Sequence, residues 1–203
     1  MNPHHSLLFQ TARVITRIIL PTRFQVSLQG LEHLPETGPA VLIPKHQQWW
    51  DVPLLAAYLP RPLLFLAKKE LFETPVSRFF ISRFGGIAVD RGNPLKSLNT
   101  FRSLHPLLQH KAFLVLFPEG TYYWETMGPG KWRLVQMLLR LQQKQDLPPI
   151  SFIPIGIRYS SPARGTNKQV EISLGPSLSE SDPFQAESFT QALLCQVKML
   201  SRL

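Results

Sequence analysis

Short apolar runs alternate with amphipathic stretches along most of this chain, and that alternation restricts its fold more than any other feature. The runs have the length of strands and lie at residues 24–28, 40–43, 63–67, 86–89, 113–117, 152–157 and 170–174. Helical spacing predicts helices at about 52–59, 75–84, 94–110, 132–145 and 183–201. Strands that alternate with helices are typical of a largely parallel sheet covered on both faces. We therefore predict an α/β fold, a single domain with a central, largely parallel sheet flanked by helices.

The N-terminal segment has a pattern of its own. Residues 5–20 have helical spacing, and Pro21 ends the pattern. Apolar residues fill most of this helix, whereas Arg13 and Arg17 belong to a narrow polar stripe. Such a helix can pack on the core or lie in a membrane interface, and the pattern allows both. At 203 residues the chain suits one well-packed domain. We divide it into an amphipathic, membrane-surface helix at 1–22 and one domain at 23–203.

The charge of the chain indicates an anionic partner. Lys and Arg number 22 against 13 Asp and Glu, which gives a formal net charge of +9. Many basic residues stand beside large apolar ones, as in residues 78–84, and this mixture suits the surface of a bilayer. The basic residues are dispersed, and the sequence shows neither a helix-turn-helix nor a stacking-aromatic signature. We therefore expect a membrane surface with anionic lipids as partner, and no nucleic acid.

The sequence also predicts how the protein meets that membrane. No stretch reaches the roughly 20 apolar residues that span a bilayer. The single cysteine, Cys195, fits a reducing compartment, and we expect it to be a small buried residue. The predicted location is the cytoplasmic face of the membrane, peripheral or monotopic, with no transmembrane span. Segments 5–20 and 75–84 are predicted to form the contact, through Arg13, Arg17, Arg78, Arg83, Phe79 and Phe80.

One polar segment directly follows a predicted strand. After the strand at 40–43, residues 44–51 read Pro-Lys-His-Gln-Gln-Trp-Trp-Asp. Active sites of parallel α/β folds gather beyond the carboxyl ends of strands. His46 and Asp51 can meet only if His46 lies in the turn and Asp51 opens the next helix as its N-cap. A carboxylate on one ring nitrogen would make the other nitrogen a competent base, although a helix cap and an ordinary loop histidine are simpler interpretations.

Other strand ends also carry polar residues. After the strongly apolar run 113–117, Glu119 and Thr121 offer an acceptor and a hydroxyl, and Gly120 permits a turn or a close approach to a ligand. Arg91 follows the strand at 86–89 and can hold a phosphate through two hydrogen bonds. Lys68 follows the strand at 63–67. Taken singly, these residues also fit a turn or a surface salt bridge.

In this order, the segments resemble the motifs of the glycerolipid acyltransferase family, typified by 1-acylglycerol-3-phosphate acyltransferase. His46 to Asp51 is similar to the family's H-x4-D block. The K-E-L and G-x-I-x-V-D-R blocks resemble residues 68–71 and 85–91, and residues 117–121 match F-P-E-G-T without a change. Residues 152–157 resemble a final V-P-I-type block. The resemblance covers about residues 24–160.

This resemblance implies that a fatty acyl group moves from acyl-CoA or acyl carrier protein to the free hydroxyl of a lysophospholipid, most commonly 1-acylglycerol-3-phosphate. It implies His46 as the base and Asp51 as the residue that orients it. Acceptor binding is implied for Lys68, Arg91, Glu119, Gly120 and Thr121. The thioester is a co-substrate, and no cofactor or metal is expected. The sequence has no G-x-S-x-G elbow, which favours direct transfer without a covalent intermediate.

Three positions depart from the family's pattern. Lys45 stands where many members have Asn or Ser, and Gln48 replaces a common Ser; we expect both to be tolerated. Tyr122 is more consequential, because the family frequently has there an Arg that assists phosphate binding. Either Lys131 or Arg133 takes over that role, or the acceptor differs: a lysophospholipid without a terminal phosphate, an amino-lipid or a glycolipid. An inactive lipid-binding relative is a further alternative.

Overall fold

The described strands form one mixed sheet. The computed structural model describes Val14, Thr16 and residues 18–83, 85–89, 103–144, 147–160 and 168–203. Its seven-stranded sheet has the order β1-β7-β6-β2-β5-β3-β4. All neighbours are parallel except β6 and β7, so β1 and β7 run against the other strands. The strands are β1 (Phe24–Gln29), β2 (Ala40–Pro44), β3 (Leu63–Lys68), β4 (Gly86–Val89), β5 (Phe113–Val115), β6 (Ser151–Ser160) and β7 (Lys168–Leu174). The predicted α/β class and all the predicted strands are confirmed.

The predicted helices of the domain are also present in the described residues. They are α2 (Asp51–Tyr58), α3 (Pro75–Arg83), α5 (Arg133–Lys144) and α6 (Ala186–Ser201), and residues 103–109 are helical. Shorter 3-10 turns lie at η2 (Leu20–Thr22), η3 (Leu31–His33), η4 (Lys69–Phe72) and η5 (Pro183–Gln185). The start of the helix predicted at 94–110, and most of the one predicted at 5–20, lie outside the described residues. Among the described residues, no helix combines the length and the apolar character needed to cross a membrane.

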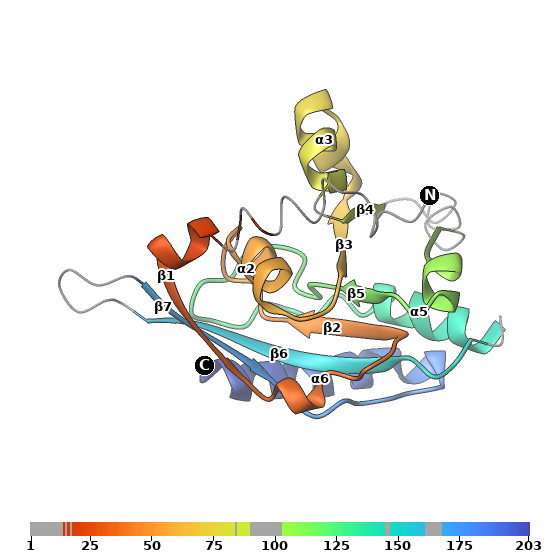
Figure 1. The fold of residues 1–203 in the computed structure, drawn as a ribbon. Coiled ribbons are helices and arrows are strands. Elements are labelled where there is room, and N and C mark those ends of the chain that lie inside the picture. Colours follow the sequence, from red (N-terminus) through yellow and green to blue (C-terminus); the bar gives the residue numbers. More distant parts are fainter. Residues whose placement is uncertain are drawn as a thin grey trace.

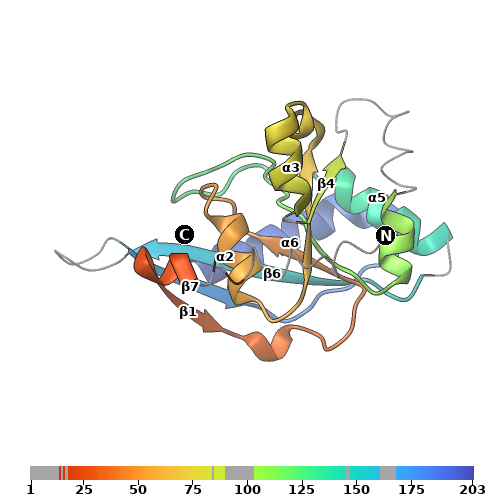
Figure 2. The ribbon, with the colours of Figure 1, turned by 45° about the horizontal axis from the view of Figure 1, so that its top comes forward.

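Strand β2 separates two hydrophobic cores. Successive side chains of a strand point to opposite faces of the sheet. Ala40 and Leu42 belong to the core that α2 covers, and Val41 and Ile43 belong to the core beneath α5, α6 and the helical residues 103–109. Figures 1 and 2 show α2 on one side of the sheet and α6 on the other. Because both faces are covered, β2 is apolar throughout and completely buried.

Several details differ from the sequence prediction, among them β6, which runs three residues past its predicted end at 157. Strand β5 ends at Val115, two residues earlier than predicted, although the backbone N–H of Leu116 still donates to the carbonyl of Leu42. In this parallel ladder the next donor from β2 would be Pro44, which has no N–H. Cys195 is exposed, not buried, because it lies on the solvent side of α6.

Candidate active site

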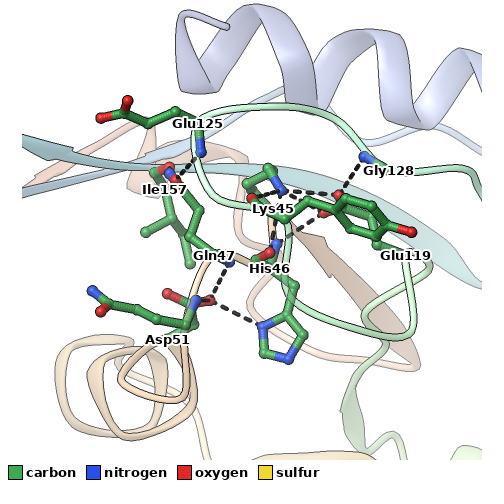
Figure 3. Close-up of polar contacts among 10 residues, drawn as sticks. Lys45, His46, Gln47, Asp51, Glu119, Glu125, Gly128 and Ile157 are labelled. Carbon is green, nitrogen blue, oxygen red and sulfur yellow. Dashed lines mark hydrogen bonds and ion pairs between the residues drawn. The ribbon is translucent and has the colours of Figure 1, made fainter.

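The loop after β2 brings His46 and Asp51 into contact. Nδ1 of His46 lies 2.9 Å from Oδ2 of Asp51, so the convergence predicted from the sequence is present. Figure 3 shows the second ring nitrogen of His46 pointing away from the carboxylate. A carboxylate that accepts the Nδ1 hydrogen leaves Nε2 with its lone pair. His46 can therefore take up a proton at Nε2 while Asp51 stabilises the resulting imidazolium.

Asp51 does not cap its helix in the predicted way. It is the first helical residue, and its Oδ2 accepts from the backbone N–H of Gln47 at 2.7 Å and of Gln48 at 2.9 Å. An N-cap would accept from the N–H groups two or three residues further on. Those positions are Pro53, which has no N–H, and Leu54, whose N–H already serves the helix. The carboxylate therefore points back into the loop, where it is completely buried.

A tyrosine that the sequence reasoning missed completes the surroundings of Asp51. The hydroxyl of Tyr159, near the end of β6, donates to Oδ1 of Asp51 at 2.6 Å. Burial, and then the negative charge of Asp51, raise the pKa of Tyr159, so its hydroxyl stays protonated and remains a donor. Strand alternation offered a signal, because Tyr159 shares the parity of Ile155 and Ile157, which pack toward α2.

His46 forms part of the wall of an apolar cleft of about 450 Å³. The rest of it is lined by Trp49 and by residues of α2, β3, η4, α3, β4 and the segment after β5. The ring of Phe117 stacks on the imidazole with centroids 3.9 Å apart, and Tyr122 meets the imidazole edge-on at 4.4 Å. The His46 side chain is 12% exposed, so the base is held in place on several sides and still reaches the cleft.

A buried ion pair lies behind the cleft. Nζ of Lys45 lies 2.9 Å from both carboxylate oxygens of Glu119, and both side chains are completely buried. Oε1 of Glu119 also accepts from the backbone N–H of His46 at 3.0 Å, and Oε2 accepts from that of Gly128 at 2.7 Å. From the sequence, Glu119 was assigned to the acceptor, whereas in this structure its carboxylate is buried beneath the cleft and both its oxygens are engaged within the protein. Its place in the site is to support the His46 backbone.

Lys45 is the second residue whose importance the sequence reasoning underrated. Burial lowers the pKa of Lys45, and the contact with Glu119 acts in the opposite direction. Its ammonium also donates to the backbone carbonyl of Tyr123 at 2.7 Å and to that of His46 at 3.2 Å. A lysine can be buried in this way only when each of its donors has a partner. Lys45, which we expected to be a tolerated departure from the family's pattern, is thus part of the framework of the site.

The same loop holds the segment 121–130 against the cleft. Tyr123 donates its backbone N–H to the His46 carbonyl at 2.9 Å. The side chain of Gln47 accepts from the N–H of Glu125 at 3.0 Å and donates to the carbonyl of Ile157 at 2.6 Å. Figure 3 shows Gln47 together with Glu125 and Ile157. The segment that carries Tyr122 is therefore tied to the residues that position His46.

The remaining predicted binding residues divide into two groups. Lys68, Gly120 and Thr121 line the cleft with His46, from the ends of two neighbouring strands, β3 and β5. Gly120 has a positive φ of 72°, a conformation that side-chain-bearing residues rarely adopt. Arg91 lies outside the described residues. The structure thus brings three of the five predicted binding residues to the cleft and places Glu119 behind it.

Fold and site together define a class of protein: an α/β domain with a histidine–carboxylate pair at the carboxyl ends of parallel strands, beside an apolar cleft. A sequence profile described as Acyltransferase matches residues 25–158, and the chain belongs to this family. The family resemblance that the motifs indicated is confirmed.

Named relatives match the same part of the chain. The 1-acyl-sn-glycerol-3-phosphate acyltransferase of Pseudomonas aeruginosa is 32% identical over 108 residues, which cover 53% of this chain and 40% of that protein. The enzyme of that name from Bacillus subtilis is 32% identical over 106 residues, 52% of each chain. The lyso-ornithine lipid O-acyltransferase of P. aeruginosa is 31% identical over 107 residues, 53% of this chain and 39% of that protein. The matches therefore span about half or less of these relatives.

A solved structure shares the fold over most of the chain. The 1-acyl-sn-glycerophosphate acyltransferase PlsC of Thermotoga maritima superimposes with a TM-score of 0.64. The match covers 96% of this chain and 81% of that one, at 15% sequence identity. At this level of identity, the superposition shows that the two proteins share a fold.

Proposed function

We propose that the protein transfers a fatty acyl group from a thioester, acyl-CoA or acyl carrier protein, to the free hydroxyl of a lysophospholipid, with 1-acylglycerol-3-phosphate as the first candidate. The observation that carries this proposal is the His46–Asp51 pair, 2.9 Å apart at the wall of an apolar cleft. The cleft has a volume typical of small-ligand sites and suits a fatty acyl chain. The names of the matched relatives support the choice of acceptor.

The geometry supports a direct transfer. Nε2 of His46 takes the proton of the acceptor hydroxyl while that oxygen forms a bond to the thioester carbonyl carbon. The tetrahedral intermediate then expels the thiolate as the C–S bond breaks, and the thiolate takes the proton back from the imidazolium. The products are an ester and a free thiol. Asp51 stabilises the positive imidazolium between the two proton transfers.

A thioester turnover assay with a panel of lysolipids tests the proposal. Purified protein is mixed with acyl-CoA or acyl carrier protein thioesters, and the acylated lipids are identified. His46→Ala is expected to lower the turnover about 100- to 10,000-fold, the usual contribution of a general base. His110→Ala is the matched control, since His110 is exposed and lies outside the cleft. Full turnover by His46→Ala would overturn the mechanism, and no turnover by the native protein would indicate an inactive lipid-binding relative.

A second acceptor class is favoured by Tyr122. This residue occupies the position where the family resemblance leads one to expect an arginine, and its ring lies 4.4 Å from that of His46. Tyr122 and Trp49 line the cleft and are 53% and 56% exposed. Aromatic rings of this kind attract cations. An amino-lipid acceptor therefore fits the mouth of the cleft, in line with the lyso-ornithine lipid O-acyltransferase among the matched relatives.

Tyr122→Arg separates the two acceptor classes. A guanidinium at this position offers a charge-assisted hydrogen bond to a phosphate, worth roughly 1.5–3 kcal/mol. The ratio of kcat/KM for 1-acylglycerol-3-phosphate over a lyso-amino-lipid should rise about 10- to 100-fold. If the native protein already prefers 1-acylglycerol-3-phosphate over every other lysolipid, the second candidate is excluded.

The proposed site of action is the cytoplasmic face of a membrane that contains anionic lipids. Helix α3 projects away from the sheet (Figure 1), and the preceding turn η4 carries the exposed Lys69 and Leu71. Leu71 and Phe79 are 49% and 53% exposed, beside the exposed Arg78. Apolar side chains flanked by cations suit the headgroup region of a bilayer. Residues Leu71 and Ile81 of η4 and α3 also line the cleft, so a membrane contact here would bring lipid to it.

A further inference from the structure

The two oxygens of the Asp51 carboxylate have different partners. Oδ2 accepts from Nδ1 of His46 and from the backbone N–H groups of Gln47 and Gln48, at 2.9, 2.7 and 2.9 Å. Oδ1 accepts from the hydroxyl of Tyr159 at 2.6 Å. The backbone donors and the histidine all come from one loop, whereas Tyr159 reaches Asp51 from β6, which is 108 residues away in the chain. Tyr159 therefore holds the Asp51 carboxylate from an element outside the His46 loop.

The contact has two physical consequences. Because Asp51 is completely buried, a strong donor at Oδ1 fixes the rotation of the carboxylate and keeps Oδ2 directed at His46. The same donor also draws negative charge toward Oδ1. Less charge remains on Oδ2, so the carboxylate stabilises a protonated imidazole less strongly. A base must be unprotonated to act, and this hydroxyl therefore bears on the pH range of the reaction.

We propose that Tyr159 is a positioning residue that acts through Asp51 and sets the pH range in which His46 works as a base. The role in the reaction rests on the proposed function, while the effect on His46 itself follows from the hydrogen bonds alone. The ring of Tyr159 also packs at 5.7 Å from that of Trp124 and at 6.4 Å from that of Phe24. Since phenylalanine retains those ring contacts, Tyr159→Phe removes the hydroxyl alone, with its hydrogen bonds to Asp51 and to the Gln48 side chain.

The test follows the titration of His46 by NMR in protein labelled with ¹⁵N at histidine. The chain has 6 histidines, and the spectrum of His46→Gln identifies the signal of His46. In Tyr159→Phe, the titration midpoint of His46 should move upward by about 0.5–1 pH unit, less than the ~1–2 units that a hydrogen bond to a charged group is worth, because the effect reaches the imidazole only through Asp51. An unchanged midpoint overturns the proposal, whatever the activity of the variant.

Two further measurements keep the test decisive. Incorporation of 3,5-difluorotyrosine at position 159 strengthens the donor and should move the titration midpoint of His46 downward. This variant provides an answer even if Tyr159→Phe folds poorly.

The pH dependence of kcat/KM is the second measurement. Its low-pH limb should shift in the same direction and by the same amount as the midpoint of His46 in each variant. If the native protein turns over no thioester, the proposed function fails, and the NMR midpoints still decide the role of Tyr159. If the NMR midpoints of His46 shift and the low-pH limb of kcat/KM does not, Tyr159 does not set the pH range of the reaction.

Discussion

At the residue level, the substitution Asp51→Asn removes the negative charge of this side chain and keeps its shape. An asparagine can keep its amide oxygen on the backbone N–H groups of Gln47 and Gln48, where Oδ2 lies now. Its amide nitrogen would then face the hydroxyl oxygen of Tyr159, which can accept instead of donate. Asp51→Asn should therefore fold like the native protein while it removes the negative charge beside His46.

This substitution predicts a loss of rate with little loss of stability. Without the carboxylate charge, the imidazolium of His46 is no longer stabilised, and kcat should fall about 100-fold or more. Steady-state turnover and thermal unfolding, measured on the same preparation, check both parts. A value of kcat close to that of the native protein would show that Asp51 only shapes the loop.

The residues of the site differ in how far the sequence could predict them. His46 and Asp51 were predictable because both lie in one short segment that joins a strand to a helix. Lys45 and Tyr159 were not, because their carboxylate partners are 74 and 108 residues away in the chain. Glu119 was assigned to the acceptor from the family resemblance and from its place after a strand, and only the fold shows its pairing with the buried Lys45. Pairings across such distances depend on which strands become neighbours.

At the level of elements, the segments after β2 and β5 form one unit. The pair between Lys45 and Glu119 joins the ends of these two neighbouring strands. The same carboxylate accepts from the backbone N–H of His46 and of Gly128. Removing either partner leaves a buried charge without its counterion, which costs far more than losing an ion pair on the surface.

Lys45→Met is therefore expected to lower the free energy of unfolding by about 3–5 kcal/mol. Adding Glu119→Gln in the double variant should recover part of this loss, because a neutral amide replaces the stranded carboxylate. Urea unfolding of the two single variants and the double variant measures the coupling between the residues.

Arg202→Met is the matched control for this cycle. Arg202 pairs with Glu171 at 2.7 Å, but its side chain is 55% exposed, so its loss should cost less than about 1 kcal/mol. Additive losses for Lys45 and Glu119 would contradict the coupled unit. Equal losses for Lys45→Met and Arg202→Met would contradict the argument from burial.

The elements were easier to predict from the sequence than the contacts between them. Apolar runs identified every described strand, most clearly β2 and β3, because strands covered on both faces have little tolerance for charge. The early end of β5 depends on Pro44 in the neighbouring strand, and no pattern within residues 113–117 carries that information. Likewise, the exposure of Cys195 depends on which side of α6 meets the sheet.

At the level of the whole molecule, the exposed apolar residues lie in more than one place. Leu71 and Phe79 stand at the projecting η4 and α3, near residues that line the cleft. Phe184, which is 88% exposed, belongs to η5 and lies near α5 and α6, the helices on the opposite side of the sheet from α2. If exposure alone drove membrane binding, all three residues would contribute. If η4 and α3 form the contact, Phe184 should not matter.

Vesicle flotation compares the double variant Leu71→Ser/Phe79→Ser with Phe184→Ser on vesicles that contain anionic lipid. Each apolar side chain inserted into the interface is worth about 1 kcal/mol or more, so the double variant should bind at least roughly 30-fold more weakly. Phe184→Ser should bind like the native protein, and all the proteins should unfold at similar temperatures because the replaced side chains are exposed. If both variants weakened vesicle binding equally, η4 and α3 would not be the specific membrane contact. A double variant that bound like the native protein would place the membrane-binding surface elsewhere on the chain.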